Sequence, residues 1–165
     1  MSNANSDLVT NFLAVPQVLS SAQQVHGVKR VASGTIALAV ADLGANDTVM
    51  LAPIPSNASI TSIKLFNDDL DSGTTNTADV GLYKQDLSVV DADAYASAIT
   101  DLRSAVKTGT EVAFEARDIN KMGQKVWQDA GLSSDPALTY FVGVSFPAAG
   151  DTAGDLSFVI EYTVS

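Results

Sequence analysis

The sequence contains no cysteine, and this absence excludes several kinds of chemistry at once. Without thiols the chain can form no disulfide framework, no thiolate zinc site and no cysteine nucleophile. No apolar run approaches the roughly 20 residues that a membrane-spanning helix requires. The N-terminal segment has no positive charge ahead of its weakly apolar centre, so it is not typical of a signal peptide. We therefore expect a soluble protein that is not exported by that route and has no membrane partner.

Basic residues are also scarce. Nine Lys and Arg stand against nineteen Asp and Glu, which gives a formal net charge of −10 and a pI near 4.2. Binding to nucleic acid depends on Lys and Arg that displace counterions from phosphates, and an acidic surface repels phosphate backbones and anionic membranes. Nucleic acid is therefore not an expected partner. Charged residues make up 17% of the chain, below the usual quarter, and the small residues that replace them favour packing and association.

The motifs that carry common enzyme chemistry are missing as well. The sequence has no G-x-S-x-G, H-E-x-x-H, P-loop or G-x-G-x-x-G pattern. Its one histidine, His26, lies in the N-terminal segment with no Ser or Cys motif placed to use it. The three glutamates, Glu111, Glu115 and Glu161, lie in expected strands rather than in a cleft suited to two-carboxylate catalysis. We expect no catalytic residue, no cofactor and no enzymatic activity.

Short strands dominate the chain after about residue 28. At 165 residues the chain most simply makes one domain, with enough residues for a hydrophobic core. Segments rich in β-branched and aromatic residues recur, bounded by Gly, Pro, Asn or Asp, as is typical of strands. The expected strands are residues 28–40, 47–54, 58–67, 77–84, 110–116, 139–146 and 156–164.

Two segments have helical spacing instead. Residues 91–106 place Tyr95, Ile99 and Leu102 on one helical face, and residues 119–132 place apolar residues four apart, with Gly131 suited to end a helix. The only tryptophan, Trp127, is expected to fill the core beneath this second helix. Strands with one or two short helical insertions predict an all-β fold. We expect a β-sandwich over residues 28–165, with the jelly roll as the favoured topology.

Residues 1–27, called the arm below, differ from the rest of the chain. They contain Pro16 and scattered apolar residues without a clear period. Two interpretations remain open: a frayed terminus, or an extended arm that becomes ordered only against the domain or a neighbouring subunit. A purely solvated tail rarely carries five large apolar residues within eight positions, and these are candidate interface residues. They are Phe12, Leu13, Val15, Val18 and Leu19.

An acidic segment, "NDDLDSGTTNTADVGLY" (67–83), allows either a metal site or a turn. As a calcium loop it fails on spacing, because glycine comes one place late at Gly73 and Ala78 occupies the twelfth position, where a bidentate glutamate is needed. Asp69 and Asp71 remain weak calcium candidates. A loop of Asp, Ser, Gly, Thr and Asn is also what a strand connection requires, so a solvated turn is the favoured interpretation.

Arg117 and Asp118 are the remaining candidate interface residues. Adjacent charges of this kind can fix a corner or cross a subunit interface. As a surface salt bridge the pair would contribute about 0–1 kcal/mol, so its expected importance is geometric.

Three stretches carry a resemblance to a known class of proteins. They are "MLAPIPSNASITSIKLFNDDLDSGTTNTADVGLY" (50–83), "EVAFEARDINKMGQKVWQDAGL" (111–132) and "FVIEYTV" (158–164). In overall pattern the chain resembles small structural proteins of tailed bacteriophages, in particular the head decoration, or cement, proteins. The resemblance implies a homo-oligomer, often a trimer, that sits on the capsid exterior and clamps neighbouring subunits of the major capsid protein. It supplies no functional residues to transfer.

The expected function is therefore a non-enzymatic virion protein, made in the host cytoplasm, whose partners are the major capsid protein and other copies of itself. Another virion component, such as a tail or fibre-base subunit, is an alternative. A carbohydrate- or calcium-binding β-sandwich module is a further one. Sugar platforms usually present exposed aromatic side chains, whereas aromatics here are 7% of the chain and lie mostly in strand patterns.

Overall fold

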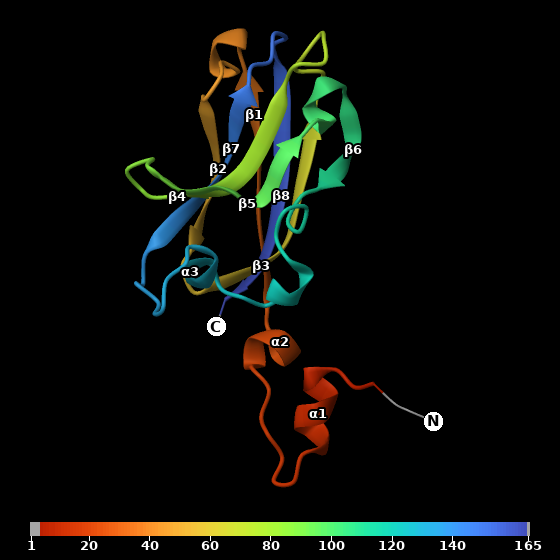
Figure 1. Cartoon of the computed structure of the whole chain (residues 1–165), viewed down its shortest axis with the longest axis vertical. Helices are drawn as coiled ribbons and strands as arrows, with labels where there is room; N and C mark the ends of the chain where they lie inside the picture. The colour runs from red at the N-terminus through yellow and green to blue at the C-terminus, as the bar shows by residue number, and fades with distance from the viewer. Residues whose placement is uncertain (1–3, 165) are drawn as a thin grey trace.

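Two antiparallel sheets form the body of the protein. The computed structural model describes residues 4–164 and gives two four-stranded sheets, ordered β1-β8-β3-β6 and β2-β7-β4-β5 (Figure 1). The strands of the first sheet are β1 (Lys29–Leu38), β8 (Gly154–Val164), β3 (Ala58–Asn67) and β6 (Val106–Glu111). Those of the second are β2 (Thr48–Pro55), β7 (Thr139–Ala148), β4 (Thr77–Tyr83) and β5 (Val89–Ile99).

The order of the strands is that of a jelly roll. β1 pairs with β8, β2 with β7, β3 with β6 and β4 with β5, each antiparallel. This is the pairing of one long hairpin that has been rolled up. The pairing of β8 with β3 and of β7 with β4 then joins the strand pairs into the two four-stranded sheets. The prediction of an all-β sandwich is confirmed, and the favoured topology is the one observed.

The core lies between the two sheets and is continuous. Alternation along the strands sends one set of side chains inward. In β3 the phase changes at a register shift between Ile60 and Ser62, so Ile60 and Ile63 are both buried. Strict alternation along the strand would place these two side chains on opposite faces. The largest fully buried side chains are Tyr83, Tyr95, Phe146, Leu43, Ile54, Ile60, Ile63, Leu65, Leu70, Leu82, Leu102 and Leu156.

The predicted helix over 91–106 is wrong, and its residues instead supply an eighth strand of the described chain. They form most of β5 and a short 3-10 helix, η2 (Asp101–Arg103). The register of β5 against β4 shifts at several points, and Ala98 has a φ of 52°. These bulges bury the consecutive residues Tyr95 and Ala96, so the apolar residues lose the two-residue period of a flat strand.

The second predicted helix, over 119–132, is present but shorter. It consists of η3 (Ile119–Lys121) and α3 (Val126–Asp129). Gly131 ends α3 as predicted. Its φ of 74° turns the chain so that the amide of Leu132 donates a hydrogen bond to the carbonyl of Trp127. Val126 enters the core, whereas Trp127 is only half-buried and is not the core plug that was expected.

The arm is not simply extended. Its described part contains two helices, α1 (Asp7–Leu13) and α2 (Ala22–His26). The Ser6 hydroxyl accepts a hydrogen bond from the Val9 amide and so caps α1. Figure 1 shows the arm, in red and orange, projecting from the end of the sandwich at which the C-terminus lies. None of the described helices has the length and apolar character needed to cross a membrane.

Candidate interaction surface

Large apolar side chains of the arm face solvent. Val15 is 97% exposed and Leu19 is 90% exposed, whereas the sandwich buries most of its large apolar residues. Only Asp7 carries a formal charge among residues 1–27, in a chain whose net charge is −10. The arm is thus an apolar, nearly uncharged segment attached to an acidic domain. Its exposed large residues are Leu8, Val9, Phe12, Leu13, Val15, Val18, Leu19 and Val25.

The arm folds back on itself. The amide of Val18 donates to the carbonyl of Asn11 over 3.1 Å, and the side-chain amide of Asn11 lies 3.2 Å from the Ser20 hydroxyl. These contacts hold α1 beside the segment that leads to α2. Between them lies a mainly apolar hollow of about 500 Å³, lined by residues that include Leu8, Phe12 and Val25.

A second hollow, of about 520 Å³, lies where the arm meets the sandwich. Its lining combines Leu8 and Gln24 of the arm with Ser59 of β3 and with Met122 and Gly123 of the turn that follows η3. The Met122 side chain is 65% exposed. Apolar surface therefore continues from the arm onto this end of the sandwich.

Arg117 lies inside the protein, and its partner is not the one expected. Its side chain is 1% exposed and its guanidinium lies 3.0 Å from the carboxylate of Asp129 on α3, whose side chain is 3% exposed. Asp118 instead caps η3 by accepting the amide of Asn120. The expected surface pair of Arg117 and Asp118 is thus replaced by a buried pair within one chain, and Arg117 has no surface to offer a partner. An interface role for the exposed Asp118 stays a prediction.

The buried guanidinium joins the two sheets. Nη1 donates to the Ile60 carbonyl of β3 over 3.3 Å, and the guanidinium lies over the Tyr95 ring of β5, 5.7 Å from its centroid. The Tyr95 hydroxyl in turn donates to Asp129 over 3.3 Å. Burial raises the pKa of Asp129, an effect that Arg117 opposes, and burial raises the pKa of Tyr95 well above its ordinary value. Sequence spacing gave no signal for this set, because its members come from separate elements.

The acidic segment is an ordered loop rather than a solvated turn. Asp71 is 2% exposed, and its Oδ2 accepts the amides of Thr75 and Asn76, each over 2.9 Å. Asp69 accepts the amide of Asp71 over 3.2 Å, and Asp79 accepts the amide of Ala98 in the β5 bulge over 2.6 Å. These carboxylates satisfy backbone donors. Within residues 4–164 no three His, Asp or Glu side chains are placed to hold a metal ion.

Replacing Asp71 with alanine is expected to destabilise the fold by about 1–3 kcal/mol, because two backbone amides lose a charged acceptor at a buried position. Urea unfolding followed by tryptophan fluorescence measures the change. The matched control is Asp69→Ala, which removes an exposed carboxylate with one longer hydrogen bond and is expected to cost less. Equal losses for the two variants would contradict the role assigned to Asp71.

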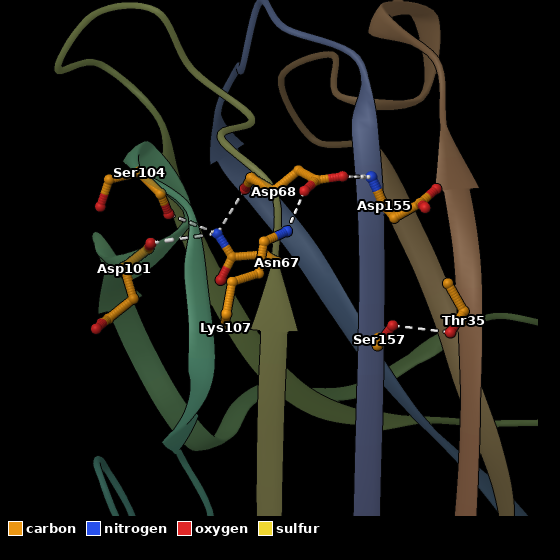
Figure 2. A network of polar contacts seen from close by, with 8 residues as sticks. All are labelled: Thr35, Asn67, Asp68, Asp101, Ser104, Lys107, Asp155 and Ser157. Carbon is orange, nitrogen blue, oxygen red and sulfur yellow. Dashed lines mark hydrogen bonds and ion pairs between the residues drawn. The ribbon is translucent and has the colours of Figure 1, made fainter.

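A polar cluster holds the adjoining end of β3, as Figure 2 shows. The buried Asn67 side chain donates to the carbonyls of Asp68, over 2.7 Å, and Ser104, over 2.8 Å. Asp68 pairs with Lys107 and accepts the amide of Asp155 over 2.9 Å. The hydrogen bond from Lys107 is the main cause that lowers the pKa of Asp68. These contacts link β3, β6 and β8 and are structural in character.

Comparison with known proteins finds likeness in structure but not in sequence. Neither a protein-family model nor a curated protein matches the chain. A chain in the capsid asymmetric unit of cyanophage Pam1 is 18% identical, with a TM-score of 0.58 and full coverage of both chains. A chain in the capsid of Ralstonia phage GP4 is 19% identical, with a TM-score of 0.60, covering 84% of this chain and 86% of that one. At these identities the likeness shows a shared fold.

Proposed function

We propose that this protein is a non-enzymatic structural component of a phage virion. In this role it binds the outside of the capsid as an oligomer and stabilises contacts between subunits of the major capsid protein. The observation that carries the proposal is the arm, whose described part exposes eight large apolar side chains beside a sandwich that has a core of its own. The two structures of similar fold come from phage capsids, which supports the same role.

The physical basis is apolar area repeated by symmetry. Burying apolar surface is worth about 25 cal/mol per Å², so one arm gives a modest contact, and many equivalent arms on a shell give a large total. The low charge of the arm keeps the cost of removing it from water small. The acidic remainder of the chain suits a shell surface that faces away from packaged DNA.

Deleting residues 1–25 is expected to weaken binding to capsids by at least about tenfold, the equivalent of about 1.4 kcal/mol, while the sandwich stays folded. Co-sedimentation of purified protein with capsids of the phage that encodes it measures the binding, and circular dichroism checks the fold. Equal binding by the truncated and full-length proteins would remove the arm from the mechanism.

A matched pair of substitutions separates the arm from apolar surface in general. Val15→Ser with Leu19→Ser changes two of the most exposed arm residues and is expected to reduce binding. Val89→Ser, at a 57% exposed position on β5, is the control and is expected to leave binding unchanged. Labelling the bound protein for electron microscopy distinguishes the capsid exterior from the alternative position at a tail or fibre base.

A further inference from the structure

Each sheet has two edge strands, and three of these four edges carry features that block further pairing. β2 contains Pro53 and Pro55, and its register against β7 shifts after Met50. β5 is broken by several register shifts against β4. β6 has only six residues and includes Gly109 at a φ of 84°. Proline, bulges and short length are the usual ways in which edge strands avoid adding a further strand.

The fourth edge, β1, has none of these features. Its ten residues pair with β8 without a register shift, from Lys29 opposite Thr163 to Leu38 opposite Gly154. It contains no proline and no acidic residue. Within the described chain β8 is its only sheet neighbour, so its other edge presents unpaired amides and carbonyls. A regular edge of this length is a template for one more strand.

The two ends of β1 carry opposite charges. The strand starts with Lys29 and Arg30, and Lys29 pairs with Glu161 of β8. Just past its other end, the carboxylate of Asp42 accepts the amide of Ala39 over 2.9 Å. Asp42 and Asp47 line a hollow of about 440 Å³, together with residues of β1 and β2. A cationic start and an acidic hollow therefore lie at opposite ends of one unpaired edge.

We propose that the free edge of β1 pairs with β1 of a second copy, antiparallel and about a twofold axis, so that the sheet continues across both molecules. Antiparallel pairing places the start of each strand against the end of the other, which brings Arg30 of each copy to the Asp42 and Asp47 hollow of its partner. Parallel pairing would set like charges together. A contact that repeats itself in this way is self-complementary, as a twofold interface must be. The contact forms without a capsid and does not depend on the proposed function.

Charge reversal tests the polar part of the interface. Analytical ultracentrifugation of the full chain at low salt should show a reversible dimer that weakens when the salt is raised. Arg30→Glu is expected to weaken it by at least about tenfold, and adding Asp47→Arg to that variant should restore much of the loss. Lys84→Glu makes the same change in charge in the turn after β4 and should leave the dimer intact. Sedimentation as a monomer at all concentrations, or an oligomer that Arg30→Glu leaves unchanged, would overturn the proposal.

Proline substitution tests the backbone part. Successive residues of a strand direct their amides to opposite sides. One of the two variants Val31→Pro and Ala32→Pro therefore removes an amide that faces β8, and the other removes an amide on the free edge of β1. The variant that keeps the thermal stability of the native protein is the free-edge variant, and it is expected to lose the dimer. Dimerisation of that well-folded variant at native strength would also overturn the proposal.

Discussion

Replacing Arg117 with methionine is expected to lower the free energy of unfolding by about 3–5 kcal/mol, because it leaves a buried carboxylate without its counter-charge. Asp129 is only 3% exposed on its side chain, and the remaining hydrogen bond comes from the Tyr95 hydroxyl. Methionine has similar length, so the loss reflects charge more than volume. Urea unfolding at neutral pH measures the change.

The control is the pair of substitutions made together. Arg117→Met with Asp129→Asn removes both charges and is expected to be more stable than Arg117→Met alone, since no unpaired charge then remains in the interior. A loss below about 1 kcal/mol for Arg117→Met would mean that the pair behaves like an exposed one. Failure of Asp129→Asn to recover any stability would show that the loss comes from the hydrogen bonds that Arg117 donates to the carbonyls of Ile60, Lys121 and Gln124.

The pH dependence of the stability of Arg117→Met follows from the pKa of Asp129. Burial raises that pKa, and Arg117 opposes the rise, so removing Arg117 raises it further. A carboxyl whose folded pKa lies above its unfolded value contributes stability below the unfolded value, and this contribution is lost as pH rises through the folded pKa. The deficit of Arg117→Met relative to the native protein should therefore shrink between about pH 7 and about pH 4.5. Comparison at each pH removes the effect of carboxyls common to both proteins, and a constant deficit would contradict the assignment.

The sandwich could be predicted from the sequence because most of its strands obey local rules. Alternation, β-branched residues and flanking turn residues locate β3 and β7 within one or two residues of their observed ends. β5 escaped these rules because its bulges are stabilised by contacts outside the strand, such as the one from Asp79 to the Ala98 amide. Because of these bulges, the apolar residues of this segment recur at a spacing that resembles the spacing in a helix.

The candidate interface was predictable only in part, for a related reason. The apolar arm residues identified by composition are exposed, because the arm forms no core of its own in which they could be buried. Their contact with a partner stays a prediction. Arg117 was linked to its sequence neighbour, whereas its partner lies twelve residues away on α3. The packing of several elements against one another decides which carboxylate pairs with a buried arginine. The distance between residues in the sequence does not predict this partner.

Replacing Gly81 with alanine is expected to destabilise the protein by about 3 kcal/mol, near the upper end for overpacking in a core. Gly81 lies in the middle of β4, where the bulged part of β5 passes close to it. A Cβ atom at this position would lie 2.1 Å from the Asp91 carbonyl oxygen and 2.4 Å from the carbonyl carbon of Ala92. Both obstacles are backbone, so no rotation of a side chain can relieve the clash.

Relief of this clash requires β5 to move off β4, which breaks the pairing that places Tyr95 beside Arg117. Urea unfolding measures the loss, and amide exchange should show faster opening of β4 and β5 than of β1 and β8. Gly73→Ala is the matched control, because its Cβ would meet only Asp71 Oδ1 at 3.9 Å, an ordinary contact in an exposed loop. We expect that variant to lie within about 0.5 kcal/mol of the native protein. Equal stability of Gly81→Ala and Gly73→Ala would contradict this prediction. It would mean that the close approach of β5 to β4 does not require glycine at position 81.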